Sequence, residues 1–145
     1  MLKIKIQKIN KLAIFPKRMT KHAAGYDLYS SNEKDIVLQA GEVILIPTGL
    51  AISLPINYEA QIRPRSGLAI KHKIGVLNSP GTIDADYRGE IKIILFNFGK
   101  EDFVISTHTR IAQMVISHHE SIDFVISEQL DETDRGNGGF GHTKH

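Results

Sequence analysis

The chain has 145 residues, 41% of them hydrophobic, and its formal net charge is +2. The length suffices for one domain with one hydrophobic core and excludes two domains of ordinary size. The balanced charge excludes a strong polyanion-binding surface, and no apolar run approaches the roughly 18 residues of a membrane span, so no nucleic-acid or membrane partner is expected.

The chain contains no cysteine. Disulfides, thiolate catalysis and cysteine-ligated zinc are therefore excluded. The first residues, Met1–Ile6, lack the apolar core of a signal peptide. We therefore expect the protein to be cytoplasmic.

Short β-type segments dominate the chain. Leu2, Ile4 and Ile6 alternate with Lys3 and Lys5, which is the two-residue period of a half-buried strand. Many short strands at spacings of about 8–12 residues predict an all-β sandwich or barrel. The further predicted strands, separated by turn-forming clusters, are Ile36–Leu38, Val43–Ile46, Tyr58–Arg63, Ile91–Phe96, Phe103–Ile105, Ile111–Ile116 and Phe124–Ile126.

One segment, Ser66–His72, favours a short helix that Ser66 is expected to cap. After residue 127 the composition becomes polar and glycine-rich, which is typical of a mobile terminal segment. We therefore expect a folded domain of residues 1–127 and a C-terminal arm of residues 128–145.

The stretch of residues 75–90 combines the end of a strand, a turn and a second extended run. Asn78–Gly81 is a dense cluster of turn formers, because Pro fixes φ and Gly frees it. Thr82 and Ile83 are β-branched and restart an extended run. The stretch therefore predicts a hairpin.

The returning arm of this hairpin carries Asp84, Asp86 and Tyr87. In a strand the two carboxylates point to the same face. Surface turns are often rich in Asp, Tyr and Arg, so an ordinary turn also explains this composition. The stretch by itself leaves both interpretations open.

Pro64–Ala69 opens the predicted helix and carries a possible anion site. Free amide groups and the helix dipole at a helix start favour negative charge, and Arg65 adds a cation beside Ser66. A serine nucleophile is not favoured, because no histidine base has a place near it. His72, on the same helix, is expected to be exposed.

Two further segments carry polar residues among apolar ones. Asp27 lies in Ala24–Ser30, which is also explained by a strand with an edge glycine. Gln113 lies in Arg110–Met114, on the opposite strand face from Arg110. A glutamine in such a place usually satisfies a local backbone group.

The C-terminal segment Arg135–Thr143 contains four glycines within six positions. Such a backbone can surround phosphates with N–H donors. Arg135 supplies a charge for a terminal phosphate, and Phe140 supplies a flat apolar face. A disordered glycine-rich end explains the glycines but not these two flanking residues.

Together these segments resemble the five signature motifs of the homotrimeric dUTPases, in the same order and over nearly the whole chain. The matching segments are Ala24–Ser30, Pro64–Ala69, Gly81–Glu90, Arg110–Met114 and Arg135–Thr143. The resemblance implies an all-β, jelly-roll-like sandwich with one short helix and a glycine-rich arm, assembled as a homotrimer with sites shared between subunits. One departure is His142, which stands where serine is common in the family.

The resemblance also implies an activity, namely hydrolysis of dUTP to dUMP and pyrophosphate, which keeps uracil out of DNA. Asp84 would activate the attacking water, Gln113 would reach the phosphates or that water, and Asp27 would act as an outer-shell carboxylate. Arg110 would make a structural ion pair. Mg²⁺ would be held by substrate phosphates and water, with no direct protein ligand. Substrate binding is implied for Arg65, Ser66, Gly67, Asn78, Gly81, Thr82, Ile83, Tyr87, Arg135, Gly138, Gly139, Phe140, Gly141 and Thr143.

Specificity is expected to come from the hairpin. Tyr87 would lie flat against the sugar and leave no space for a 2′-hydroxyl, while Asn78 and the hairpin backbone would pair with the edge of uracil. Cytosine presents reversed groups there and would leave buried partners unpaired. Two alternatives stay open: a dCTP deaminase-like enzyme of the same fold, and a non-catalytic β-sandwich binding module.

Overall fold

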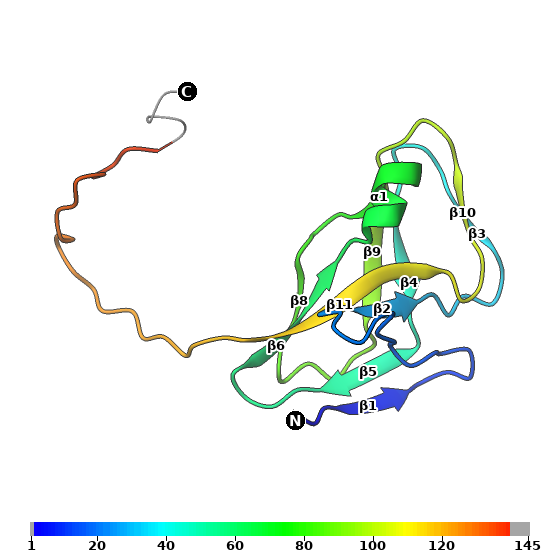
Figure 1. Cartoon of the computed structure of the whole chain (residues 1–145), viewed down its shortest axis with the longest axis horizontal. Coiled ribbons are helices and arrows are strands. Elements are labelled where there is room, and N and C mark those ends of the chain that lie inside the picture. Colours follow the sequence, from blue (N-terminus) through cyan, green and yellow to red (C-terminus); the bar gives the residue numbers. More distant parts are fainter. Residues whose placement is uncertain (1, 140–145) are drawn as a thin grey trace.

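The computed structural model describes residues 2–139. It is mostly β, with one short helix (Figure 1). In chain order the elements are β1 (Lys5–Lys8), β2 (Tyr26–Tyr29), β3 (Ile36–Leu38), β4 (Val43–Pro47), β5 (Leu50–Ser53), β6 (Tyr58–Arg63), α1 (Ser66–His72), β7 (Ile74–Val76), β8 (Gly81–Ile83), β9 (Lys92–Asn97), β10 (Phe103–Ile105) and β11 (Arg110–His118). No helix within residues 2–139 is long and apolar enough to cross a membrane.

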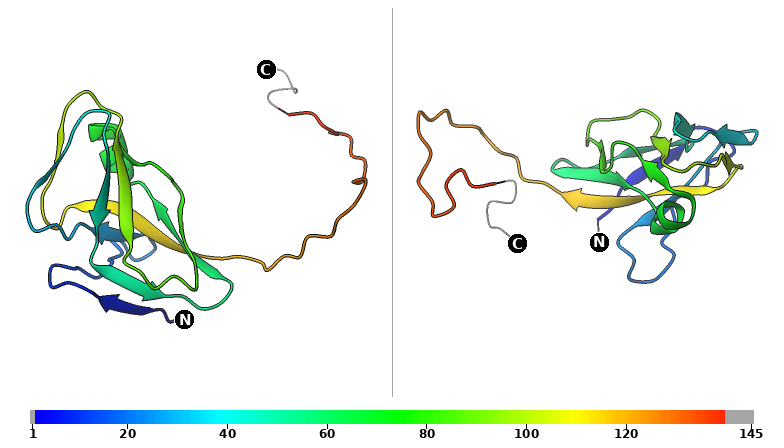
Figure 2. Two further views of the ribbon diagram at one scale, coloured as in Figure 1. Left: turned by 180° about the vertical axis from the view of Figure 1, so that it is seen from behind. Right: turned by 90° about the horizontal axis from the view of Figure 1, so that it is seen from above.

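The strands form two main sheets and two strand pairs. The larger sheet has the order β2-β11-β6-β8 and the smaller one β4-β9-β7, while β1 pairs with β5 and β3 with β10. All these pairings are antiparallel. Connections that cross between sheets in this way produce a jelly-roll-like sandwich (Figure 2), which confirms the predicted fold class.

The core consists of aliphatic side chains from both sheets. Ile93 and Leu95 on β9 are fully buried, and so is Ile111 on β11, whereas Lys92 is exposed. This alternation follows from the two-residue period of a strand and sets the register of β9. Asn97, also fully buried, donates to the carbonyl groups of Leu38 and Glu101, so its amide is satisfied.

Most predicted strands are confirmed, some with shifted ends. Tyr58–Arg63 and Phe103–Ile105 occur as expected. The N-terminal strand begins at Lys5, and all four of its residues are exposed in the single chain. The prediction that this strand is half-buried is therefore wrong for the single chain. Strand β5 is not predicted from the sequence, because Leu50, Ala51 and Ile52 are all buried and show no alternation.

The strand predicted at Phe124–Ile126 is absent. These three residues are exposed, from 86% for Phe124 to 99% for Ile126. A strand needs a neighbour, and none of the strands described in residues 2–139 pairs with this segment. The chain instead leaves the packed body after His118 at the end of β11 and continues as an extended segment (Figure 1).

Helix α1 matches its predicted bounds, but its cap differs. Arg65 occupies the N-cap position with extended backbone angles, and no side chain caps the helix, so the role expected for Ser66 is wrong. The helix ends at Lys73, whose φ of 58° is left-handed and whose N–H donates to Ala69 O. His72 is exposed, as predicted.

The stretch of residues 75–90 is not a paired hairpin. β7 pairs with β9 in one sheet, whereas β8 pairs with β6 in the other, so the turn between them passes from sheet to sheet. The strand also ends earlier than expected, at Ile83. Asp84 and Asp86 therefore lie in a turn, closed by the Tyr87 N–H donating to Asp84 O at 3.2 Å, and the prediction that they share one strand face is wrong.

Candidate active site

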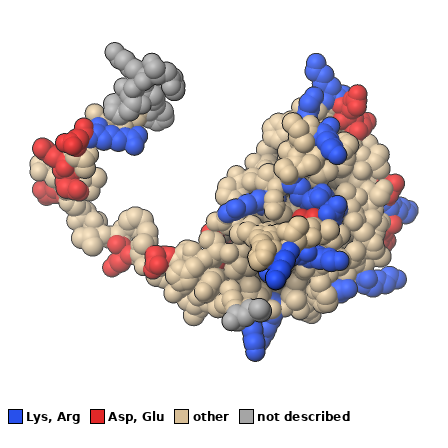
Figure 3. Space-filling view, viewed as in Figure 1, with Lys and Arg blue, Asp and Glu red and all other residues tan. Residues whose placement is uncertain are grey.

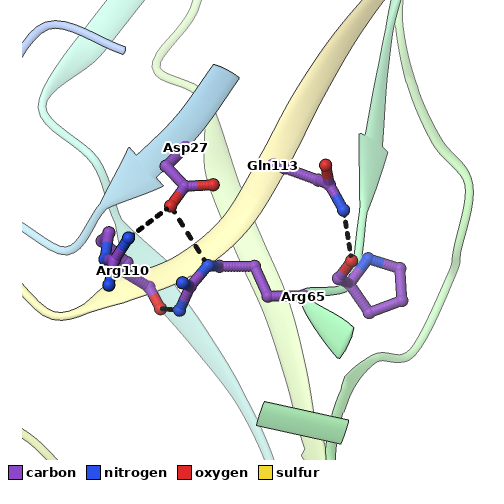
Figure 4. A network of polar contacts seen from close by, with 5 residues as sticks. Asp27, Arg65, Arg110 and Gln113 are labelled. Carbon is purple, nitrogen blue, oxygen red and sulfur yellow. Dashed lines mark hydrogen bonds and ion pairs between the residues drawn. The ribbon is translucent and has the colours of Figure 1, made fainter. Parts of the chain in front are cut away.

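A buried carboxylate with two arginines forms the centre of the site (Figure 4). Asp27 on β2 is only 9% exposed. Its Oδ2 accepts a hydrogen bond from Arg110 Nη1 at 3.1 Å and lies 3.3 Å from Arg65 Nε. The ion pair expected for Arg110 is therefore confirmed, and it connects β11 to β2 and to the residue that precedes α1.

The cluster of Asp27, Arg65 and Arg110 has an excess of positive charge, because two guanidinium groups face one carboxylate. Arg65 Nη1 also donates to Arg110 O at 3.0 Å, so the Arg65 side chain is held at two points. A fixed guanidinium group with remaining free donors is well suited to bind phosphate. The arrangement favours an anionic ligand.

Gln113 connects β11 to the turn before α1. Its Nε2 donates to Pro64 O at 2.9 Å, which is the backbone-satisfying role that the sequence pattern indicated. Its Oε1 lies against Gly25, where an added Cβ would overlap it. Gly25 is thus a positioning residue, whereas the sequence pattern indicates only an edge glycine.

Asp27, Gln113 and Arg63 lie in one row across the larger sheet. Gln113 on β11 pairs with Asp27 on β2 on one side and with Arg63 on β6 on the other. The row therefore joins residues far apart in the sequence and places three polar side chains near the turn that leads into α1.

Asp84 lies far from this row within the same chain. Ile83 pairs with Ala60 on β6, three residues before Arg63, so Asp84 lies four residues away from the row along the strand direction. Because the strand order is β2-β11-β6-β8, Asp84 also lies three strand spacings from Asp27 across the sheet. At about 3.3 Å per residue and about 4.8 Å per strand, the separation is about 20 Å. A general base must lie about 3 Å from the water that it activates. One chain therefore does not bring Asp84 to the arginine cluster.

The turn that carries Asp84 is ordered by its own contacts. The Tyr87 hydroxyl donates to Glu90 O at 3.0 Å, and its ring lies against Gly89, where a Cβ would overlap the hydroxyl. Arg88 Nη1 donates to Ala85 O at 2.6 Å. The Tyr87 ring is thus held in place while 43% of the residue stays exposed, and Asp84 remains open to solvent.

The sequence model of the dUTPase family matches residues 11–144. The chain belongs to the dUTPase family. It is 60% identical to the deoxyuridine 5′-triphosphate nucleotidohydrolase of Rickettsia felis over 141 residues, covering 97% of this chain and 95% of that protein. The enzyme of the same name from Rickettsia canadensis is 60% identical over 140 residues, covering 96% and 95%.

Two solved dUTPase structures have a fold similar to that of this chain. The dUTPase of Staphylococcus bacteriophage 80alpha, determined with dUpNHpp, superposes with a TM-score of 0.85 at 26% identity and covers 97% of this chain and 98% of its own. The dUTPase of S. aureus phage phi11, for which coordination of a structural Mg(II) ion is described, has a TM-score of 0.82 at 24% identity and covers 90% and 99%. The second comparison supports the fold alone.

The remaining candidate residues lie in three places in this dUTPase-family chain. Ser66 and Gly67 are exposed at the start of α1, beside Arg65, and Asn78, Gly81, Thr82 and Ile83 lie in the turn and in β8. Arg135, Gly138 and Gly139 lie in the extended segment, where Arg135 Nε donates to Gly138 O at 2.8 Å. Phe140, Gly141 and Thr143 lie outside the described residues.

Replacing Gly25 by Ala tests the packing against Gln113. The added methyl group would displace the Gln113 amide and break its bond to Pro64 O, so we expect the free energy of unfolding to fall by about 1–3 kcal/mol. Urea unfolding measures this. Gly67→Ala is the matched control for stability, because nothing lies within 4 Å of a Cβ placed there. Equal stability of both variants would show that Gln113 moves aside at no cost.

Proposed function

We propose that this chain hydrolyses dUTP to dUMP and pyrophosphate through a water activated by Asp84. The positively charged, pre-ordered cluster of Asp27, Arg65 and Arg110 is the observation that carries the proposal, because it offers an anion site where the family's phosphate-binding motifs meet. The bond that forms joins the water oxygen to the α-phosphorus. The bond that breaks joins the α-phosphorus to the oxygen that bridges to the β-phosphate, and the water proton passes to Asp84.

Phosphate binding would fall to the residues around this cluster. Arg65 supplies charge, Ser66 and Gly67 supply donors at the start of α1, and Gln113 holds the preceding turn through Pro64. Phosphoryl transfer requires mainly positioning and charge neutralisation, so a rigid set of cations is the main requirement. From the arm, Arg135, Gly138 and Gly139, with Phe140, Gly141 and Thr143, would close over the nucleotide.

The separation of about 20 Å between Asp84 and Asp27 supports a site built by more than one subunit. We propose a homotrimer in which Asp84 of one subunit faces the arginine cluster of a second. The arm of a third would complete the site. The folded domain and the C-terminal arm, divided near residue 127, then have separate roles in binding and closure.

The turn at residues 78–90 would select the nucleotide. The ring of Tyr87, held against Gly89, presents a flat surface that would pack on deoxyribose and exclude a 2′-hydroxyl. The Asn78 amide and the backbone of Gly81, Thr82 and Ile83 would bind uracil. Cytosine would leave those groups unpaired, and such buried unpaired groups give strong discrimination.

A magnesium ion fits the donors present. No group of three or more His, Cys, Asp or Glu residues within residues 2–139 is arranged to hold a metal. The proposed ion would be bound mainly by substrate phosphates and water. Asp27 Oδ2 takes both arginine contacts and leaves Oδ1 outside them (Figure 4), so Oδ1 is suited to accept a hydrogen bond from a coordinated water. The ion would neutralise negative charge on the phosphates.

Incubation with dUTP, dCTP, dTTP and UTP, with and without EDTA, tests the proposal. We expect pyrophosphate release from dUTP alone and a large loss of rate with EDTA. Ammonia release from dCTP would instead indicate the deaminase-like alternative. Absence of turnover with all four nucleotides and added Mg²⁺ would contradict the proposal and favour a binding module.

A further inference from the structure

The carboxylate of Glu90 connects the turn that carries Asp84 and Tyr87 to a distant part of the chain. Its Oε1 accepts a hydrogen bond from the Gly49 N–H at 2.8 Å, and its Oε2 lies 3.6 Å from Lys92 Nζ. The backbone oxygen of Glu90 accepts the bond from the Tyr87 hydroxyl at 3.0 Å. Glu90 therefore joins Tyr87 to Gly49, a residue 41 positions earlier in the chain.

Gly49, the donor to this carboxylate, is held by its own surroundings. It is buried in the turn between β4 and β5, and its φ of 66° is left-handed. A Cβ there would lie 2.6 Å from Asn10 Nδ2 and 2.8 Å from the Cβ of Ala13, so the backbone approaches these residues closely. Its oxygen also accepts a hydrogen bond from the Ile9 N–H at 2.8 Å. The position of the Gly49 N–H is thus set by the packed body rather than by the turn of Tyr87.

The residue after Glu90 is bound to the same region. Ile91 is fully buried, its N–H donates to Leu50 O at 2.8 Å, and its oxygen accepts from Thr48 Oγ1 at 2.6 Å. Three hydrogen bonds therefore connect Glu90 and Ile91 to the region where β4 passes into β5. The chain that follows Tyr87 is fixed there, although the turn itself is exposed.

The Tyr87 ring depends on this region for its position. The residue is 43% exposed, and its ring lies against Gly89, whose lack of a Cβ leaves room for the ring and its hydroxyl. The bond from the hydroxyl to Glu90 O holds the far end of the ring, so both ends of the side chain are fixed. Without that bond, an exposed tyrosine is free to change its rotamer.

Charge does not distinguish dUTP from UTP. Both nucleotides carry the same triphosphate, and the basic side chains that Figure 3 shows on this face of the body attract both. The two differ only at the 2′ position, where UTP has an additional hydroxyl group. Discrimination therefore requires a surface that excludes this oxygen. A surface excludes an atom only if it does not move aside, so the rigidity of the surface determines the selectivity.

We propose that Glu90 is a positioning residue for sugar selection, because it holds the Tyr87 ring so that the ring excludes the 2′-hydroxyl. The carboxylate binds the Gly49 N–H and sets the place of the Glu90 carbonyl group, which in turn holds the Tyr87 hydroxyl. The inference rests on the proposed function, in which Tyr87 packs on deoxyribose. It assigns the selectivity to the contact between Glu90 and Gly49 as well as to the ring itself.

The test compares the binding of two analogues, dUpNHpp and its ribonucleotide counterpart UpNHpp, to the assembled full-length protein with Mg²⁺. Calorimetric titration gives the ratio of the two dissociation constants. Glu90→Ala removes the bond to Gly49, and Tyr87→Phe keeps the ring but removes the bond to Glu90 O. We expect each variant to lower the preference for dUpNHpp roughly tenfold, at the lower end of what a close-fitting pocket gains from one small group. The change should come from tighter binding of UpNHpp.

Two control variants separate positioning from a general loss of structure. Glu90→Gln keeps an acceptor oxygen at the same length of side chain and should retain most of the parent's preference. Thr48→Val removes the neighbouring buried bond to Ile91 O but leaves the bonds of Glu90 and Tyr87 in place, so it should lower stability and not selectivity. Urea unfolding is measured on every variant.

The double variant of Glu90→Ala and Tyr87→Phe tests whether both residues act through the position of the ring. Its preference should fall no further than that of the more affected single variant, because the second change removes a connection that is already broken. Should Glu90→Ala not fold, Tyr87→Phe decides alone, since it alters only an exposed residue.

Three outcomes would overturn the inference. They are equal affinity of the parent for both analogues, an unchanged preference in folded Glu90→Ala or Tyr87→Phe, and an equal fall in Thr48→Val. Pyrophosphate release from dUTP is measured on the same samples. If the parent releases pyrophosphate and both variants keep its preference, only this inference fails. If the variants lose the preference and the parent releases no pyrophosphate, only the proposed hydrolysis fails.

Discussion

Asp84→Asn is expected to lower the turnover of dUTP by roughly 10²–10⁴-fold. The amide keeps the shape and the exposed position of the side chain but cannot accept the proton of the attacking water. The residue lies in an ordered turn that depends on Tyr87, Gly89 and Glu90 rather than on the Asp84 carboxylate, so the fold should not change. Steady-state kinetics measures the loss, and calorimetric titration with dUpNHpp should show binding within a fewfold of the parent.

Asp86→Asn is the matched control, because this carboxylate lies in the same exposed turn two residues later. It should retain most of the activity. If both substitutions reduced turnover equally, the charge of the turn would matter rather than a base at Asp84. Near-normal turnover of Asp84→Asn would remove the assigned role altogether.

Ending the chain after Leu130 is expected to lower turnover by roughly 10²-fold or more while leaving the assembly intact. The removed residues include Arg135 and the glycine run, which would close over the phosphates and exclude water. The body ends at β11, and residues 119–137 are exposed, so the fold loses little packing. Analytical ultracentrifugation and kinetics on the same sample measure both effects.

Complementation tests whether the arm acts on the active site of its own subunit or on that of a neighbouring subunit. Truncated chains keep Asp84, and full-length Asp84→Asn chains keep the arm. Mixed trimers made by co-refolding should contain some sites with both, and their activity should rise well above that of either parent. If native mass spectrometry shows mixed trimers and activity does not rise, the arm acts on the Asp84 of its own subunit.

Pattern alone predicted the strands whose residues alternate between core and solvent. It failed at β5, where three successive residues are buried, because such a strand has no period to detect. It failed in the opposite way at Phe124–Ile126, where the β-type residues have no partner strand within the described chain. Local composition indicates a preference for extended structure, whereas strand pairing requires a neighbouring strand with free backbone hydrogen-bonding groups.

Short sequence motifs also indicate the candidate residues of the site, namely Asp27, Arg65, Gln113 and Asp84. Gly25 is not among them, because the reason for a glycine there is the Gln113 side chain that occupies the space of a Cβ, 88 positions further along the chain (113 − 25). A contact between the residue before β2 and a side chain on β11 has no local signal.

The sequence by itself determined the fold class, the family and the chemical groups available, because alternation and motif order are local properties of the chain. Only the tertiary structure decided how those groups meet. The strand order β2-β11-β6-β8 brings Asp27 and Gln113 together and leaves Asp84 about 20 Å away. That distance follows from hydrogen-bonded register between distant strands, and it is the reason why we propose a site that two or more subunits build together.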